Sequence, residues 1–99
     1  MASVTLEDIV VQTKAVLSAN AGTEILAMDE QSGNCFSFSG SGRFIWEYAK
    51  EPIRVRDICA RLRQHYTVDE ATCVSETLDY IDVLIVENLL RVDTAEAPS

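Results

Sequence analysis

The chain contains few of the residues that build metal centres, disulfide frameworks or membrane spans. It has one histidine, two prolines and three cysteines in 99 residues, and the cysteines lack the C-x-x-C spacing of zinc and redox sites. No apolar run approaches the roughly 18 residues that cross a bilayer, and residues 1–10 lack the pattern of a signal peptide. We therefore expect a cytoplasmic protein with no metal, no cofactor and no membrane partner, in which Cys35, Cys59 and Cys73 are small core residues.

Positive charge is also scarce. Eight Lys and Arg residues stand against sixteen Asp and Glu residues, which gives a net charge of −8. The charges are segregated, because residues 43–63 hold six of the eight bases and residues 69–87 hold six acids and no base. The summed field repels a phosphate backbone, so we expect no nucleic-acid partner.

Three short strand-like runs predict a small antiparallel sheet. They span residues 15–20, 24–29 and 34–39, and turn signals separate them. In the third run the alternation places Phe36 and Phe38 on one face, which we expect to point into the core. Successive hairpins would join the three runs into a meander.

The second half of the chain has helical periodicity, with apolar residues at 3.6-residue spacing. Ser39 or Ser41 is the candidate N-cap of the first helix, and either Asp69 or a capping box beginning at Thr67 would start the third. The three expected helices span residues 40–49, 54–65 and 69–88.

These elements predict an α+β fold, in which a three-stranded antiparallel sheet is followed by three helices in a winged helix-turn-helix-like order. We place the domain at residues 15–92. The weak periodicity of residues 1–14 allows a helix, an extended lead-in or a flexible arm. We expect residues 93–99 to form a flexible tail.

The third helix has more apolar surface than a small core needs. Two neighbouring apolar stripes cover an arc of roughly 180°, whereas a core-facing helix needs only about 100°. Either the helix is buried between two layers, or part of it lines a groove that a partner fills. Spacing leaves both alternatives open. One stripe contains Val74, Leu78, Ile81 and Ile85, and the other contains Cys73, Thr77, Tyr80 and Leu84.

The segment Gly40-Ser41-Gly42 invites interpretation as a phosphate-binding loop, because it lies between a strand and a helix. The third glycine of that motif would fall at Ile45, and no parallel βαβ repeat is present. We interpret the segment as a strand-to-helix turn.

No other constellation indicates catalysis. The lone His65 lacks partners for a metal site or a catalytic triad. The acids Glu76, Asp79 and Asp82 have the spacing of a solvated helix face rather than of paired catalytic carboxylates. We therefore expect that the protein is not an enzyme.

The order of motifs over residues 15–92 is informative as a whole. An aromatic strand is followed by an Ile-Trp-Glu helix, a Val-x-x-Ile helix, a Tyr-x-Val-Asp turn and a long helix that ends near Leu-Leu. This combination resembles the PqqD-like peptide-recognition domains of ribosomal peptide natural-product pathways. The Ile-Trp-Glu helix looks most like the leader-binding partner in lasso-peptide biosynthesis.

The resemblance implies a non-catalytic domain that binds the leader segment of a precursor peptide and presents it to a leader peptidase and a cyclase. The leader would add as an extra strand to the edge of the third strand and pack over the third helix. The peptide-binding residues that the resemblance implies are Asn34, Cys35, Phe36, Ser37, Phe38, Ser39, Val74, Leu78, Ile81, Asp82 and Ile85.

Two alternatives remain open. Within the family, the chain could instead be a peptide carrier for pyrroloquinoline quinone synthesis, which hands its peptide to a radical enzyme. In a different class, it could be a winged-helix DNA-binding regulator, whose third helix would enter the major groove. The acids of residues 69–87 oppose that second alternative, since they would face phosphates.

Overall fold

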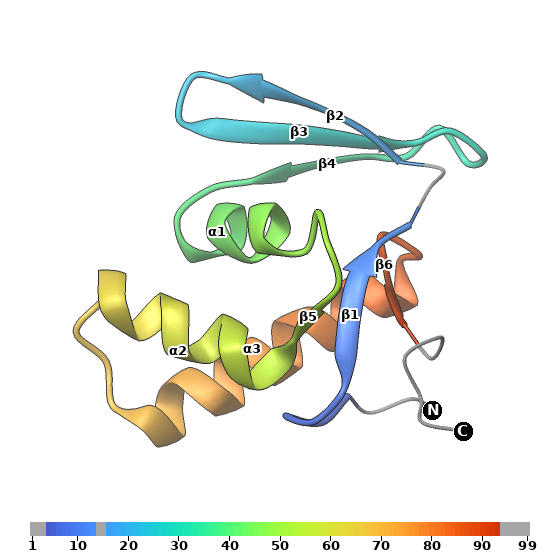
Figure 1. Ribbon diagram of the computed structural model, residues 1–99. Coiled ribbons are helices and arrows are strands. Elements are labelled where there is room, and N and C mark those ends of the chain that lie inside the picture. Colours follow the sequence, from blue (N-terminus) through green and yellow to red (C-terminus); the bar gives the residue numbers. More distant parts are fainter. Residues whose placement is uncertain (1–3, 14–15, 94–99) are drawn as a thin grey trace.

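The residues that the structure describes fold into two small antiparallel sheets and three helices, which confirms the α+β class (Figure 1). The computed structural model describes residues 4–13 and 16–93. The elements in chain order are β1 (Ile9–Gln12), β2 (Val16–Ala21), β3 (Glu24–Asp29), β4 (Cys35–Phe38), α1 (Ser41–Tyr48), β5 (Ile53–Arg54), α2 (Val55–His65), α3 (Glu70–Val86) and β6 (Leu90–Val92).

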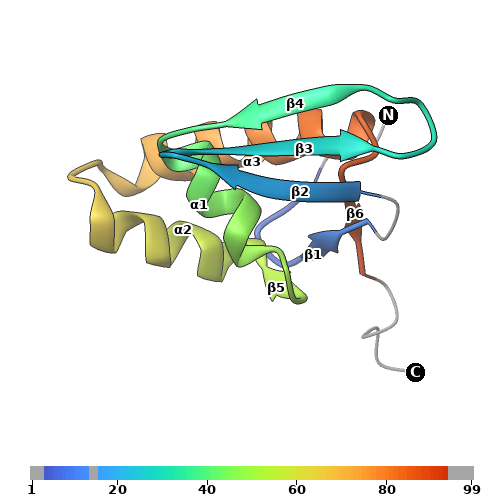
Figure 2. The same ribbon diagram turned by 90° about the horizontal axis from the view of Figure 1, so that it is seen from above.

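The first sheet is the predicted meander, with strand order β2-β3-β4. Alternation along β3 buries Ile25 and Ala27 on one face and exposes Leu26 and Met28 on the other. Figure 1 shows this sheet as an upper layer, with α1 beneath it and α2 and α3 below. In the view from above, β2 and β4 form the two edges, and β4 lies on the side of α3 (Figure 2). As expected, Phe38 points into the core and is only 2% exposed.

A second sheet forms from segments that are far apart in the sequence. β1 is its central strand and pairs antiparallel with β5 on one side and with β6 on the other. Of the alternatives for residues 1–14, the extended one is therefore correct for Ile9–Gln12. Residues 1–3, 14, 15 and 94–99 lie outside the described residues, including most of the expected tail.

The N-termini of α1 and α3 are capped differently. No side chain caps α1, so the expectation of a Ser39 or Ser41 cap is wrong. The Ncap residue is Gly40, whose φ of 58° and ψ of −135° suit glycine alone. At α3 the predicted Asp69 cap is confirmed, because its carboxylate accepts the Thr72 N–H at 3.0 Å. The hydrogen bonds from Thr72 lower the pKa of Asp69.

The core lies between the first sheet and the helices and centres on Trp46. This side chain is completely buried, and its ring stacks on that of Phe38 with centroids 4.9 Å apart. Cys59 and Cys73 are buried as expected, but Cys35 is exposed. The core assignment of Cys35 is wrong. Side chains alternate along β4, so Cys35 points to the exposed face of the strand and Phe38 to the buried face. Within the described ranges, no helix is long and apolar enough to cross a membrane.

Candidate functional site

The outer edge of β4 is open. Among the described residues, β3 is the only strand that pairs with β4. The Asp29 N–H donates to the Asn34 carbonyl at 3.0 Å. This bond determines which residues of β4 direct their backbone groups toward β3 and which direct them away from it. Because hydrogen bonding alternates along an antiparallel strand, the backbone N–H and C=O groups of Cys35 and Ser37 point to the open edge.

The side chains of β4 carry no feature that would oppose pairing with another strand. β4 contains no charged residue and no proline, and Cys35 and Ser37 are exposed. Natural proteins commonly protect such edges with lysine, proline or a bulge. β4 therefore offers an additional strand a set of unpaired backbone donors and acceptors.

Tyr80 of α3 stands beside the inner face of β4. Its ring lies edge-on to Phe38, with centroids 6.5 Å apart and an interplanar angle of 75°. Burial raises the pKa of the Tyr80 hydroxyl. A Cβ atom at Gly42 would lie 2.4 Å from that hydroxyl oxygen. Gly42 is thus the residue that lets the Tyr80 ring reach the start of α1.

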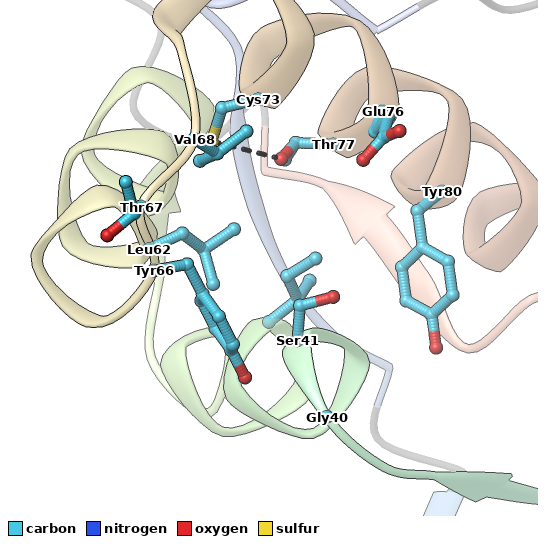
Figure 3. Close-up of a pocket in the computed structure, with 11 residues that line it drawn as sticks. Gly40, Ser41, Leu62, Tyr66, Thr67, Val68, Cys73, Glu76, Thr77 and Tyr80 are labelled. Atoms are coloured by element: carbon cyan, nitrogen blue, oxygen red, sulfur yellow. Dashed lines mark hydrogen bonds between the residues drawn. The ribbon is translucent and has the colours of Figure 1, made fainter.

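A cavity of about 500 Å³ opens next to Tyr80, at the carboxyl end of β4. Figure 3 shows side chains from α2, the α2–α3 loop and α3 around it, with Tyr80 directed toward the start of α1. Its walls are largely apolar, and Glu76 is the acidic residue in the lining, which contains no Lys, Arg or His. Residues that line the cavity include Gly40, Ser41, Leu62, Tyr66, Glu76 and Tyr80.

The helix residues proposed from the sequence lie on other parts of α3. Ile81 has no exposed surface and packs in the core. Leu78 and Ile85 are half-buried against that core. Val74 is offset from Tyr80 by about 120° around the helix, and Asp82 by about 160°. Tyr80 lies on a different side of the helix, and its ring contacts Phe38 of β4.

The N-terminal segment lies along the Val74 and Asp82 side of α3. Val74 lines a small hollow together with Leu6. The Asp82 carboxylate accepts the backbone N–H of Val4 at 2.8 Å. The apolar arc of α3 therefore contacts the N-terminal segment on the Val74 side and Phe38 of β4 through Tyr80.

Sequence reasoning did not select Tyr80 or Val83 as functional residues. Val83 is 56% exposed and lies on the same side of α3 as Tyr80. Tyr80 belongs to the second apolar stripe, which the periodicity could not rank against the first. The sequence feature that could have singled out Tyr80 is its side chain, because a tyrosine in an apolar stripe has a polar hydroxyl at the end of its ring.

The remaining reactive side chains have structural contacts. The His65 ring stacks on Phe44 with centroids 4.6 Å apart. The Cys73 thiol donates to the Cys59 carbonyl at 3.8 Å, and burial raises the pKa of the Cys59 thiol. In the part of the chain that the structure describes, no group of His, Cys, Asp and Glu side chains could hold a metal ion.

Comparison with known proteins identifies a family and a structural neighbour. The family model described as coenzyme PQQ synthesis protein D (PqqD) matches residues 24–90. A solved structure described as TbiB1 in complex with the TbiA(beta) leader peptide superposes with a TM-score of 0.77 and 26% sequence identity. The match covers 90% of this chain and 98% of the TbiB1 chain. No curated protein sequence matches.

Proposed function

Because this chain belongs to the PqqD family, we propose that it is a recognition element that binds the leader segment of a ribosomally made precursor peptide, without catalysing a reaction itself. The observation that carries the proposal is the open, uncharged edge of β4 beside Tyr80. The similarity to TbiB1, whose structure contains a leader peptide, supports it.

In the proposed complex the leader adds to β4 as a fourth strand of the first sheet. The two N–H and two C=O groups of Cys35 and Ser37 would pair with the leader backbone, within the segment Asn34–Ser39. At about 0.5–1.5 kcal/mol each, four such bonds contribute about 2–6 kcal/mol. A micromolar complex needs about 8 kcal/mol, so apolar contacts must supply the rest.

We assign those apolar contacts to the side of α3 that bears Tyr80 and Val83. Inward-facing side chains of an added strand would lie next to Phe36 and Phe38, on the same side of the sheet as α3. The exposed Val83 would lose its water on binding. Ile81 is outside this proposed surface, since it has no exposed area.

We further propose that the bound leader is presented to a leader peptidase and a cyclase in lasso-peptide biosynthesis. The Ile-Trp-Glu segment of α1 supports this pathway through its resemblance to lasso-type leader-binding partners. The alternative is a peptide carrier for pyrroloquinoline quinone synthesis, which the family description supports by naming coenzyme PQQ synthesis. Neighbouring genes for a short precursor, a peptidase and a cyclase would favour the lasso pathway, and a radical enzyme gene would favour the alternative.

Calorimetric titration tests the proposed function. The probe is a synthetic peptide of about 20 residues, taken from the leader of the precursor encoded beside the chain. We expect a dissociation constant of about 1 µM or tighter, because strand pairing and apolar contact add together. A scrambled peptide of the same composition should bind at least about tenfold more weakly, a difference of 1.4 kcal/mol.

The same experiment separates the proposal from a winged-helix DNA-binding function. A 20-base-pair duplex at low salt is the second titrant, since any phosphate-driven binding is strongest there. We expect no binding, because α3 carries acids and no base. Duplex binding that falls steeply with salt, together with no response to the leader, would overturn the leader-binding function.

A further inference from the structure

The cavity at the carboxyl end of β4 has a lining that suits one kind of side chain. We propose that it is a subsite for a lysine or arginine of the bound leader, with Glu76 as the specificity-determining residue. This inference rests on the proposed leader-binding function and adds to it the chemistry of one leader residue. The supporting features are the position of the cavity, the character of its walls and the free carboxylate of Glu76.

The position of the cavity follows from the chain path. β4 ends at Phe38, and Gly40 and Ser41, only two and three residues later, form part of the cavity wall. A peptide paired along β4 advances about 3.3 Å per residue, so the first residue or two past Phe38 reach the cavity. This holds whether the peptide runs parallel or antiparallel to β4.

The walls suit the long apolar stem of a basic side chain. Ile45, Leu62 and Val68 line the cavity, and no Lys or Arg does. Lysine and arginine bury their methylene stems against such surfaces and keep the charged head near water. An acidic leader residue would instead meet Glu76 at close range, with no base in the lining to offset the repulsion.

The carboxylate of Glu76 is available to a ligand. Within residues 4–13 and 16–93, no hydrogen bond or ion pair engages Glu76, whereas Asp69 caps α3 and Asp82 accepts the Val4 N–H. In Figure 3, Glu76 lies between Thr77 and Tyr80 on the face of α3 that borders the cavity. A cation at the mouth of the cavity can therefore pair with Glu76 without displacing an existing partner.

Asp79 provides a matched control on the same helix. It is exposed, as Glu76 is, and carries the same charge, but it does not line the cavity. Neutralising either acid changes the net charge by one unit, so a general field effect would be equal in the two variants. A subsite effect would appear only for Glu76.

Peptide selection on the intact chain tests the inference. The probe is a phage library of random 12-residue peptides, selected on the immobilised full chain and read by sequencing. We expect lysine or arginine to be enriched at one fixed position of the selected peptides. For one selected peptide, Lys→norleucine should weaken binding about fivefold to the wild type and to Asp79→Asn, and less than about twofold to Glu76→Gln.

The outcomes separate this inference from the function on which it rests. A selected peptide supports both the subsite and the leader-binding function if it shifts the backbone amide resonances of β4 and if its lysine contributes to binding only when Glu76 is present. Selected peptides that shift the β4 amides but show no basic preference, or that bind Glu76→Gln as the wild type does, overturn the subsite and leave leader binding intact. Selected peptides that do not shift the backbone amide resonances of β4 overturn the proposed function and the subsite with it. A failure to select any peptide does the same.

Discussion

Replacing Ser37 with proline should weaken leader binding by about tenfold or more and leave the fold intact. The Ser37 N–H points to the open edge of β4, so proline removes a donor that the leader needs. Its ring would also stand where the added strand must approach. The ladder with β3 is spared, because it uses the backbone groups of Phe36 and Phe38.

Ser37→Ala is the matched control for this variant. It removes the hydroxyl but keeps the backbone N–H, and we expect leader affinity within about twofold of the wild type. Calorimetry gives the affinities, and circular dichroism checks that the proline variant is folded. A folded Ser37→Pro variant with wild-type affinity would mean that the leader does not pair with β4.

Truncating Ile81 should produce the largest loss of stability on α3. Ile81 has no exposed surface and contacts the core, so Ile81→Ala leaves a cavity and costs about 2–5 kcal/mol in the free energy of unfolding. A domain of this size has a total stability of about 5–15 kcal/mol, so the variant should be partly unfolded at modest urea concentrations. Urea denaturation followed by tryptophan fluorescence measures the change through Trp46.

Val83→Ala is the corresponding exposed substitution, two residues further along α3. Val83 is 56% exposed, so we expect its truncation to change stability by less than about 0.5 kcal/mol. In the proposed complex it faces the leader, and its loss should weaken binding about threefold. If Ile81→Ala proved stable yet deficient in leader binding, Ile81 would belong to the groove and not to the core.

The first sheet and the helices were predictable from the sequence because each element has a local signal. Turn residues bound the strand-like run of residues 24–29, side chains alternate in residues 34–39, and apolar residues recur at helical spacing in residues 54–65. The second sheet was not predictable in this way. β5 has two residues and β6 has three, too few to show a period, and β1 is recognisable only by its partners.

The face of α3 that serves the candidate site could not be read from spacing. Both stripes of the helix are apolar, and the structure buries parts of both. The side bearing Val74 and Asp82 contacts residues 4–6, a segment that the sequence left without an assigned conformation. That tertiary contact occupies the Val74 side of α3, whereas Tyr80 contacts Phe38 of β4.

The two glycines after β4 also show that tertiary contacts are not visible in the sequence. Gly40 has a local cause, because its backbone conformation suits glycine alone. Glycine is required at position 42 for a different reason, because the ring of Tyr80, 38 residues further along the chain, packs against it. Sequence reasoning identified the turn but not this second requirement, which links the start of α1 to the candidate site.

Hydrogen exchange of single backbone amides tests most directly whether β4 receives the leader as an added strand. In the free protein we expect the amides of Cys35 and Ser37 to exchange rapidly, since they face the open edge, and those of Phe36 and Phe38 to be protected by β3. Saturating leader should slow exchange at Cys35 and Ser37 by about tenfold or more. Exchange at these two amides that stays unchanged while the leader is bound would contradict strand addition at β4.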